Sequence, residues 1–203
     1  MQDEQYVKRS GVDVKSLPAN FPTQLHSPTF WEAFGRAVAT FSFLEDTLGK
    51  AIFSFTATRE YPEEDVGAAF QKWLLTLRRA LSDPLGGLIV SYGKAVRENP
   101  KATISHLDEL LDALRKAATV RNVLCHGSWC RQPDHHGRSV PFFVSNKDET
   151  YKTPIGVGFL VDARRDATAL VCAVMNTVTD MGWQFPGTNG PGTPILQSRR
   201  AKG

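Results

Sequence analysis

Residues 27–56 read SPTFWEAFGRAVATFSFLEDTLGKAIFSFT, and this stretch decides the fold class. Apolar side chains recur in it at spacings of three and four residues, which places them on one face of an α-helix. These side chains are Phe30, Phe34, Val38, Phe41, Leu44, Leu48 and Ile52. Ser27-Pro28 is a typical helix start, with a capping hydroxyl before a proline in the first turn. We predict a helix from Thr29 to about Thr56, in which Gly35 and Gly49 permit close approach of another helix.

Four more segments show helical spacing of apolar residues. They run from the acidic stretch 61–65 to Leu81, from Ser82-Asp83-Pro84 to Val96, from Asn99-Pro100 to His126, and from Asp162 to Met181. Acidic residues in a first turn are favoured by the helix dipole, and a residue such as Asn followed by proline indicates a helix start. Gly127 directly follows the fourth segment and is typical of a helix C-terminus.

The pattern changes between the fourth and fifth predicted helices. Residues 128–132 and 138–144 flank the turn sequence PDHHG and predict a β-hairpin, and residues 151–160 predict a third strand. The chain is therefore expected to be mainly α, a bundle of four to five helices with a small β-hairpin insertion, about 128–160, before the last helix.

The predicted domain boundaries follow from changes in composition and from the positions of prolines. Prolines 18 and 22 interrupt the first 26 residues, so residues 1–26 are interpreted as an N-terminal arm. Residues 27–185 form the predicted helical domain, and residues 186–203 are interpreted as a flexible basic tail.

Composition limits the classes of function. The formal net charge of the 203 residues is +3, but three of the positive charges lie in the last six residues, so the remaining chain is balanced. A balanced body gives no general case for nucleic-acid binding, and a local patch would have to supply it. The three cysteines, an odd number, and the polar N-terminus favour a reducing cytoplasm over secretion. Because no apolar run approaches bilayer length, no membrane partner is expected.

The segment Arg121-Asn122-Val123-Leu124-Cys125-His126-Gly127 carries the most specific chemistry in the chain. Arginine can clamp a phosphate with its planar fork, and histidine can transfer a proton near neutral pH. Five steps of about 100° place Arg121 and His126 about 140° apart on a regular helix. They meet if the helix ends near Cys125 and His126 turns back, or if each faces a two-fold partner. Alternatively, Arg121 is a surface residue and His126 simply marks a helix terminus.

The motif Arg121-Asn122-x-x-x-His126-Gly127, late in a helical chain, resembles the Arg-x4–6-His motif of the HEPN (higher eukaryotes and prokaryotes nucleotide-binding) superfamily. The early helix adds to this resemblance, since Gly35 to Glu45 followed by Leu48 is similar to a helix of bacterial HEPN-like proteins that often carries a glutamate. The resemblance covers roughly residues 28 to 130. In one HEPN branch a tyrosine that receives a nucleotidyl group lies two residues after the histidine. Ser128 occupies that position here, so this form of neutralisation is not expected.

The resemblance implies a HEPN-like bundle that pairs with a second copy and cleaves RNA without a metal. Arg121 would stabilise the charged phosphorane, His126 would transfer protons, and Asn122 would be a polar support. The product would carry a 2′,3′-cyclic phosphate. Such proteins act as toxins, antiphage effectors or RNA-processing enzymes, and a toxin would have an antitoxin or regulatory partner. Others are inactive and bind nucleotides or proteins, which is the alternative function.

Glu45 lies on the apolar side of the first predicted helix, four residues after Phe41. A carboxylate near the core needs a partner. It either orients Arg121 through a salt bridge, as a fourth member of the site, or lies at the edge of the apolar stripe and pairs with Lys50 or Arg36.

The insertion offers candidate substrate-binding residues. Trp129, Arg131 and Arg138, with Phe142 and Phe143, can stack and clamp single-stranded RNA, although ordinary hairpin packing uses the same residues.

A zinc site is the competing interpretation of the Cys and His residues in this region. It would draw on Cys125, His126, Cys130, His135 and His136. No Cys-x2-Cys pair is present, Cys125 is expected to face the core, and the two adjacent histidines lie in a predicted turn. We therefore expect no metal and no cofactor.

Overall fold

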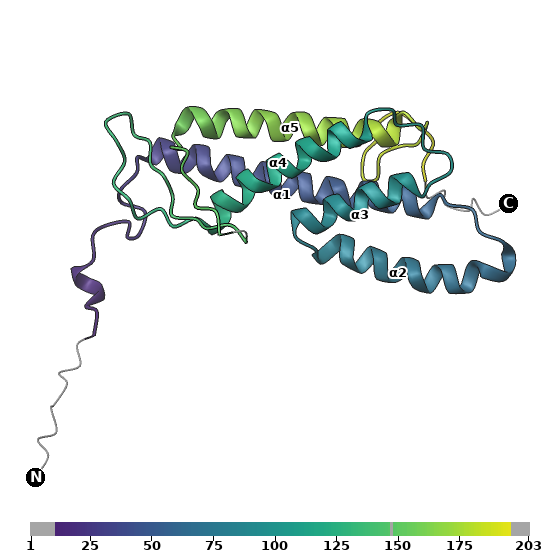
Figure 1. The fold of residues 1–203 in the computed structure, drawn as a ribbon, viewed down its shortest axis with the longest axis horizontal. Coiled ribbons are helices and arrows are strands. Elements are labelled where there is room, and N and C mark those ends of the chain that lie inside the picture. Colours follow the sequence, from purple (N-terminus) through teal and green to yellow (C-terminus); the bar gives the residue numbers. More distant parts are fainter. Residues whose placement is uncertain (1–10, 147, 196–203) are drawn as a thin grey trace, which may run out of the picture.

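The structure is a computed structural model, and it describes residues 11–146 and 148–195. These residues form five α-helices: α1 (Pro28–Ala57), α2 (Val66–Ser82), α3 (Leu85–Arg97), α4 (Leu107–His126) and α5 (Val157–Thr179), with short 3-10 turns at Val14–Ser16 and Glu63–Asp65. Figure 1 shows α5, α1 and α4 running together and α2 along the opposite edge. The mainly helical class is confirmed. None of the helices in the described part of the chain is both long and apolar enough to cross a bilayer.

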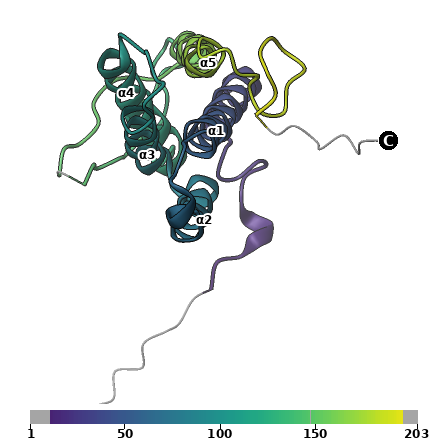
Figure 2. The same ribbon diagram turned by 90° about the vertical axis from the view of Figure 1, so that its right-hand side faces the viewer.

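Helix α1 is the centre of the bundle. It contacts each of the other four described helices, most extensively α5, and the end-on view in Figure 2 shows it between α5 and α2, with α3 and α4 on one side. The Ser27 hydroxyl accepts a hydrogen bond from the Phe30 amide at 3.2 Å, and Pro28 is the first helical residue. Leu44 and Leu48 are fully buried, and burial of one such side chain stabilises by roughly 1.5–3 kcal/mol.

Helix α2 packs on the bundle through a close approach at Gly49. A Cβ added there would lie 2.9 Å from the Ala80 carbonyl oxygen, so this glycine permits the predicted contact, whereas a Cβ at Gly35 would meet nothing within 4 Å. Elsewhere α2 is poorly covered. All of its residues are described, and of these only Ala80 is buried, while the predicted apolar face leaves Phe70 and Leu81 exposed.

The fourth helix begins later than predicted. Helix α4 starts at Leu107, not at Asn99-Pro100. Asn99 is buried, and its side-chain amide donates to the Phe55 carbonyl at 2.8 Å and to the Thr58 hydroxyl at 3.1 Å. The side chain therefore ties down the C-terminal end of α1 instead of capping a helix.

The predicted β-hairpin insertion is not shown. Described residues between α4 and α5 form isolated antiparallel bridges, Ser128 with Phe142, Ser139 with Ile155 and Val144 with Thr150, rather than strands. Prolines at 133, 141 and 154 lack the N–H that a continuous ladder requires. The predicted third strand is also interrupted, because α5 begins at Val157 and Asp162 lies inside it, paired with Arg165 at 2.8 Å.

The segments next to the first and last helices pack on the bundle, whereas the described residues before His26 are mostly exposed and extend away from it (Figure 1). His26 is buried, its Nε2 lies 2.8 Å from the Ser139 hydroxyl, and burial lowers the pKa of its imidazole. At the other end, the Gln184 backbone N–H donates to the Thr193 carbonyl at 2.9 Å. Part of the predicted flexible tail, residues 186–195, thus forms a loop after α5, and the three basic residues of that prediction lie outside the described residues.

Candidate functional site

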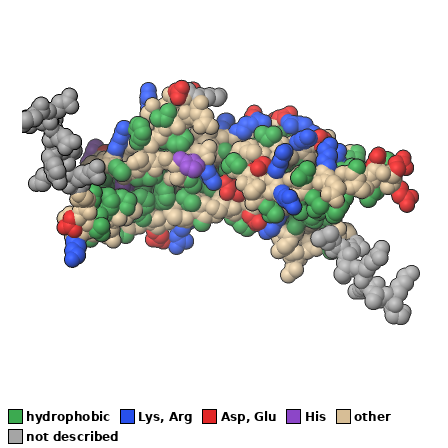
Figure 3. All heavy atoms as spheres, turned by 90° about the horizontal axis from the view of Figure 1, so that it is seen from below, with side chains coloured by type: hydrophobic (Ala, Val, Ile, Leu, Met, Phe, Trp, Pro, Cys, Tyr) green, Lys and Arg blue, Asp and Glu red, His purple; other side chains and the backbone are tan. Residues whose placement is uncertain are grey.

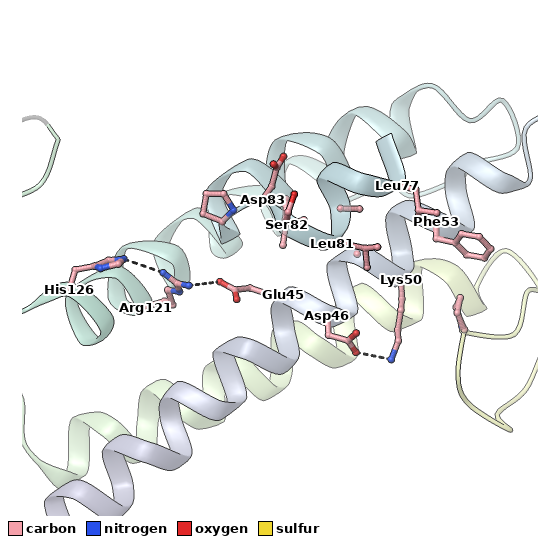
Figure 4. A pocket seen from close by; sticks show the side chains of 15 residues that line it. Glu45, Asp46, Lys50, Phe53, Leu77, Leu81, Ser82, Asp83, Arg121 and His126 are labelled. Atoms are coloured by element: carbon pink, nitrogen blue, oxygen red, sulfur yellow. Dashed lines mark hydrogen bonds and ion pairs between the residues drawn. The ribbon is translucent and has the colours of Figure 1, made fainter. Parts of the chain in front are cut away.

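The Arg121 guanidinium is the centre of the candidate site. It projects from the last turns of α4 toward the middle of α1, where its Nη2 lies 3.0 Å from Glu45 Oε1 (Figure 4). The two side chains are only 20% and 23% exposed. The contact is an ion pair without an aligned hydrogen bond, and Oε1 is itself buried. The predicted salt bridge is therefore present, whereas Lys50 and Arg36, its expected competitors, pair with Asp46 and Glu32.

His126 meets Arg121 although α4 continues through both residues. Arg121 Nη1 and His126 Nε2 are 3.4 Å apart. The helix ends at His126 and is capped by Gly127, close to the predicted end, but His126 is its last residue and does not turn back out of it. The contact forms because the long arginine side chain spans the angular separation that the two Cα positions impose. Guanidinium nitrogens can only donate, so a hydrogen bond across this contact has Arg121 as the donor and His126 Nε2 as the acceptor.

Asn122 completes the set on the solvent side. Its side-chain oxygen lies 3.4 Å from the same Nη1 of Arg121, and the residue is exposed. One guanidinium thus contacts a carboxylate, an amide and an imidazole that come from α1 and from the last turns of α4. All four residues predicted for the site lie together.

Gly127 is required by close packing rather than by a left-handed backbone. Its φ of −71° and ψ of 142° are extended, unlike the left-handed conformation usual for a C-terminal glycine. A Cβ there would lie 2.5 Å from the Val123 carbonyl oxygen and 3.0 Å from the Pro141 ring. The chain can therefore leave α4 beside His126 and pass directly under the loop that follows.

Arg121 and His126 open into a groove of about 770 Å³, which we name the site groove. It lies between α1, the turn from α2 to α3, and the end of α4, as Figure 4 shows. Its ionisable residues are Glu45, Asp46, Lys50, Asp83, Arg121 and His126. In a formal count that leaves the histidine out, the described lining has three carboxylates against two cations. The groove is thus slightly acidic, which does not favour an anionic ligand.

Sequence reasoning did not assign Asp46 or Asp83 to the site. Asp83 was interpreted only as part of the start of the third helix, and it reaches the groove because the turn between α2 and α3 lies beside α1. Asp46 directly follows Glu45 and belongs to an ordinary i,i+4 pair with Lys50 at 2.7 Å. No local sequence signal separates such a pair from a surface salt bridge.

The predicted substrate-binding residues do not form one cluster. The half-buried ring of Trp129 packs edge-on against Phe34, with ring centroids 5.3 Å apart, and belongs to an aromatic cluster with His26 and Phe30. Arg138 is held by Asp134 at 3.0 Å, and hydrogen bonds from the Arg138 backbone and side chain lower the pKa of that carboxyl to about 2. These two residues therefore serve packing and turn formation.

Arg131 remains exposed above the Phe142 ring, 6.0 Å from its centroid. Phe142 itself pairs with Ser128, two residues after His126. Of the three predicted contacts, Arg131 is thus the one that is exposed and forms no ion pair within the described residues.

The cysteine and histidine cluster considered for zinc does not assemble. Within residues 11–146 and 148–195, no group of three or more His, Cys, Asp or Glu side chains is arranged to hold a metal ion. Cys125 is exposed rather than directed into the core, because the helix turns its buried side to Val123 and Leu124.

Comparison with protein-family models, curated proteins and solved structures returned no significant match.

Proposed function

We propose that this protein is a metal-independent endoribonuclease of HEPN type, in which Arg121 and His126 act on one phosphodiester. The observation that carries the proposal is the 3.4 Å contact between the Arg121 guanidinium and the His126 imidazole at the edge of an open groove. The ion pair with Glu45 fixes the position of the guanidinium. A fixed cation beside a proton-accepting imidazole suits a reaction that develops negative charge on a phosphate.

The proposed reaction is an internal transesterification. The ribose 2′-hydroxyl oxygen attacks the adjacent phosphorus and gives its proton to His126 Nε2. For this step the Arg121 guanidinium moves from Nε2 to the phosphorane oxygens, whose charge it stabilises. The bond from phosphorus to the 5′ oxygen then breaks, and that oxygen takes up a proton. The products are a 2′,3′-cyclic phosphate and a 5′-hydroxyl. Asn122 supports the guanidinium on the side away from Glu45.

A second copy of the chain is part of this proposal, because one imidazole cannot act at once as base and as acid. His126 of the second protomer would supply the proton for the leaving oxygen. The apolar lining beside the site supports such pairing, since Leu81 borders the site groove and is 80% exposed. Light scattering of the purified protein would show a dimer, and Leu81→Lys is expected to shift it toward monomer.

The biological setting follows from the same proposal. A cytoplasmic ribonuclease of this kind would serve as a toxin or antiphage effector and would be held in check by an antitoxin or regulatory protein.

The decisive test is cleavage of labelled single-stranded RNA in EDTA by the wild type and by Arg121→Ala and His126→Ala. We expect cyclic-phosphate ends from the wild type and a loss of at least about 100-fold in rate from each variant. Arg115→Ala, on the same helix, and His135→Ala are matched controls that keep the activity. Cleavage that survives both site substitutions would refute the proposal.

The second candidate is a catalytically silent module that binds a nucleotide or a protein. Two observations favour this second candidate: the pairing of Arg121 with Glu45 and the acidic lining of the site groove. Both weaken the electrostatic attraction of the groove for a phosphate. A folded dimer that binds but never cleaves RNA would establish this reading.

A further inference from the structure

A second cleft lies on α2 and differs from the site groove in charge. It has a volume of about 430 Å³ and is bordered by the end of α1, the segment after it, α2 and α3. We name it the basic cleft, after Arg59, Lys72, Arg79 and Lys94, which line it. Among its described lining residues these four cations face a single carboxylate, Glu98. In Figure 3, Lys and Arg side chains gather over the half of this face that carries α2 and α3.

The cations of the basic cleft are incompletely neutralised. Arg59 and Lys94 share Glu98, at 2.9 Å and 3.8 Å. Lys72 and Arg79 are exposed and form no ion pair with any residue in the described ranges. The chain without its basic tail is neutral overall, so this cleft concentrates positive potential where a phosphate can enter.

The basic cleft also holds fixed donors and an accessible ring. Arg59 is 27% exposed and is placed both by Glu98 and by the Tyr61 ring, whose centroid lies 5.8 Å from the guanidinium carbon. Tyr61 is 42% exposed. Trp73 is anchored by a hydrogen bond from its indole nitrogen to the Thr56 hydroxyl at 3.1 Å. Cations that follow a backbone, beside a ring on which a base can stack, are the elements of single-strand recognition.

The basic cleft adjoins the site groove along α2 and α3. On α2, Arg79 lines the cleft and Ser82 lines the groove. These two residues are three positions apart, which is about 4.5 Å of helical rise. On α3, Leu88 borders the groove and Ser91 the cleft, at the same separation. Lining residues of the two sites are thus close along both helices, as a strand that reaches from Arg121 into the cleft requires.

We propose that the basic cleft binds the sugar–phosphate backbone of single-stranded RNA flanking the cleaved phosphate, with Lys72 and Arg79 as the principal phosphate contacts. The proposal rests on the ribonuclease function and supplies what the site groove lacks, since the acidic groove gives little attraction for a polyanion. The cleft would set affinity and the site groove would carry out the chemistry.

The test is equilibrium binding of a fluorescent oligouridylate to the full chain carrying His126→Ala, so that the RNA stays intact. In this background the double variant Lys72→Ala/Arg79→Ala is compared with Arg78→Ala/Lys116→Ala, which removes the same charge from exposed residues outside the cleft. We expect the cleft variant to weaken binding at least about tenfold. Its salt dependence, log K against log salt, should become shallower by about 1.4, because two phosphate contacts are lost. The control pair should stay within about twofold of the parent.

Unchanged affinity and salt slope in the cleft variant would overturn the proposal. A mononucleotide that binds through Lys72 and Arg79 as tightly as the strand would also overturn it, in favour of a free-nucleotide site. The outcome is separable from the catalytic test. If the cleft binds RNA and the wild type never cleaves it, the ribonuclease proposal fails alone, whereas cleavage with a cleft variant of unchanged affinity refutes only the cleft.

Discussion

The site groove and the basic cleft border the same helix, α2, yet they are built in opposite ways. The groove sets Arg121, Lys50 and His126 beside three carboxylates, and both of its permanent cations are paired, Arg121 with Glu45 and Lys50 with Asp46. The cleft sets four cations against one carboxylate and leaves two of them unpaired within the described chain. The difference indicates a division of labour, because a site that must hold an arginine in one geometry needs a counter-ion, whereas a site that attracts a polyanion needs free charge.

The largest effect is expected from Arg121→Lys. The lysine keeps the charge but loses the planar fork that contacts Glu45, Asn122 and His126 together. The single-turnover cleavage rate in EDTA should fall about 100-fold, a loss comparable to removal of an oriented electrostatic donor. RNA affinity should change little, because the basic cleft is intact. Arg115→Lys on the same helix is the control, and a fully active Arg121→Lys enzyme would mean that charge alone suffices in the groove.

The next largest effect is expected from a change that displaces α2, the helix that lines both the site groove and the basic cleft. Gly49→Ala would place a methyl group 2.9 Å from the Ala80 carbonyl and force α2 away from α1. We expect the free energy of unfolding in urea to fall by about 1–3 kcal/mol, with RNA binding and cleavage both impaired.

Gly35→Ala, in the same helix, is the matched control for that change. It meets nothing within 4 Å and should be neutral or stabilise by roughly 0.5–1 kcal/mol. Equal stability of the two variants would show that α2 does not depend on this contact.

A smaller effect is expected when the one carboxylate of the cleft is neutralised. Glu98→Gln removes the negative charge that Arg59 and Lys94 share, at positions that are partly exposed. RNA affinity should rise about threefold, the scale of an exposed ion pair, and the cleavage rate of bound RNA should stay unchanged. Glu109→Gln, which alters an exposed carboxylate on α4, should leave affinity unchanged. Weaker binding by Glu98→Gln would mean that placing Arg59 matters more than the charge itself.

The smallest effect lies outside both clefts, at His26. Burial lowers the pKa of this imidazole below its usual 6.5, so the unfolded chain binds the proton more tightly than the folded one. The contribution of the buried neutral imidazole to the free energy of unfolding is therefore complete above about pH 6.5. It is lost as the pH falls below that value. Urea unfolding at a series of pH values should show this decrease, and His26→Gln should remove that part of the pH dependence. An unchanged pH profile in this variant would assign the decrease to other groups.

The sequence predicted those parts of the fold that depend on local spacing. The stripe from Phe30 to Ile52 and the capped start at Ser27 place α1 to within a residue at each end. The same type of signal at Asn99-Pro100 predicted a helix start that is not there. The Asn99 side chain donates to acceptors at the end of α1 instead, and the local sequence pattern does not reveal such a distant partner. The insertion was misread for a related reason, since alternating residues suggested strands while the prolines removed the donors that a ladder needs.

By itself, the sequence determined a helical chain and a helix end that carries Arg121 and His126, because helical periodicity, caps and a short motif are properties of neighbouring residues. Only the tertiary structure decided that Glu45 reaches Arg121, that the groove around them is acidic, and that Arg59, Lys72, Arg79 and Lys94 share a cleft. These features join helices far apart along the chain. Their charges cancel in the composition, and only packing separates them in space.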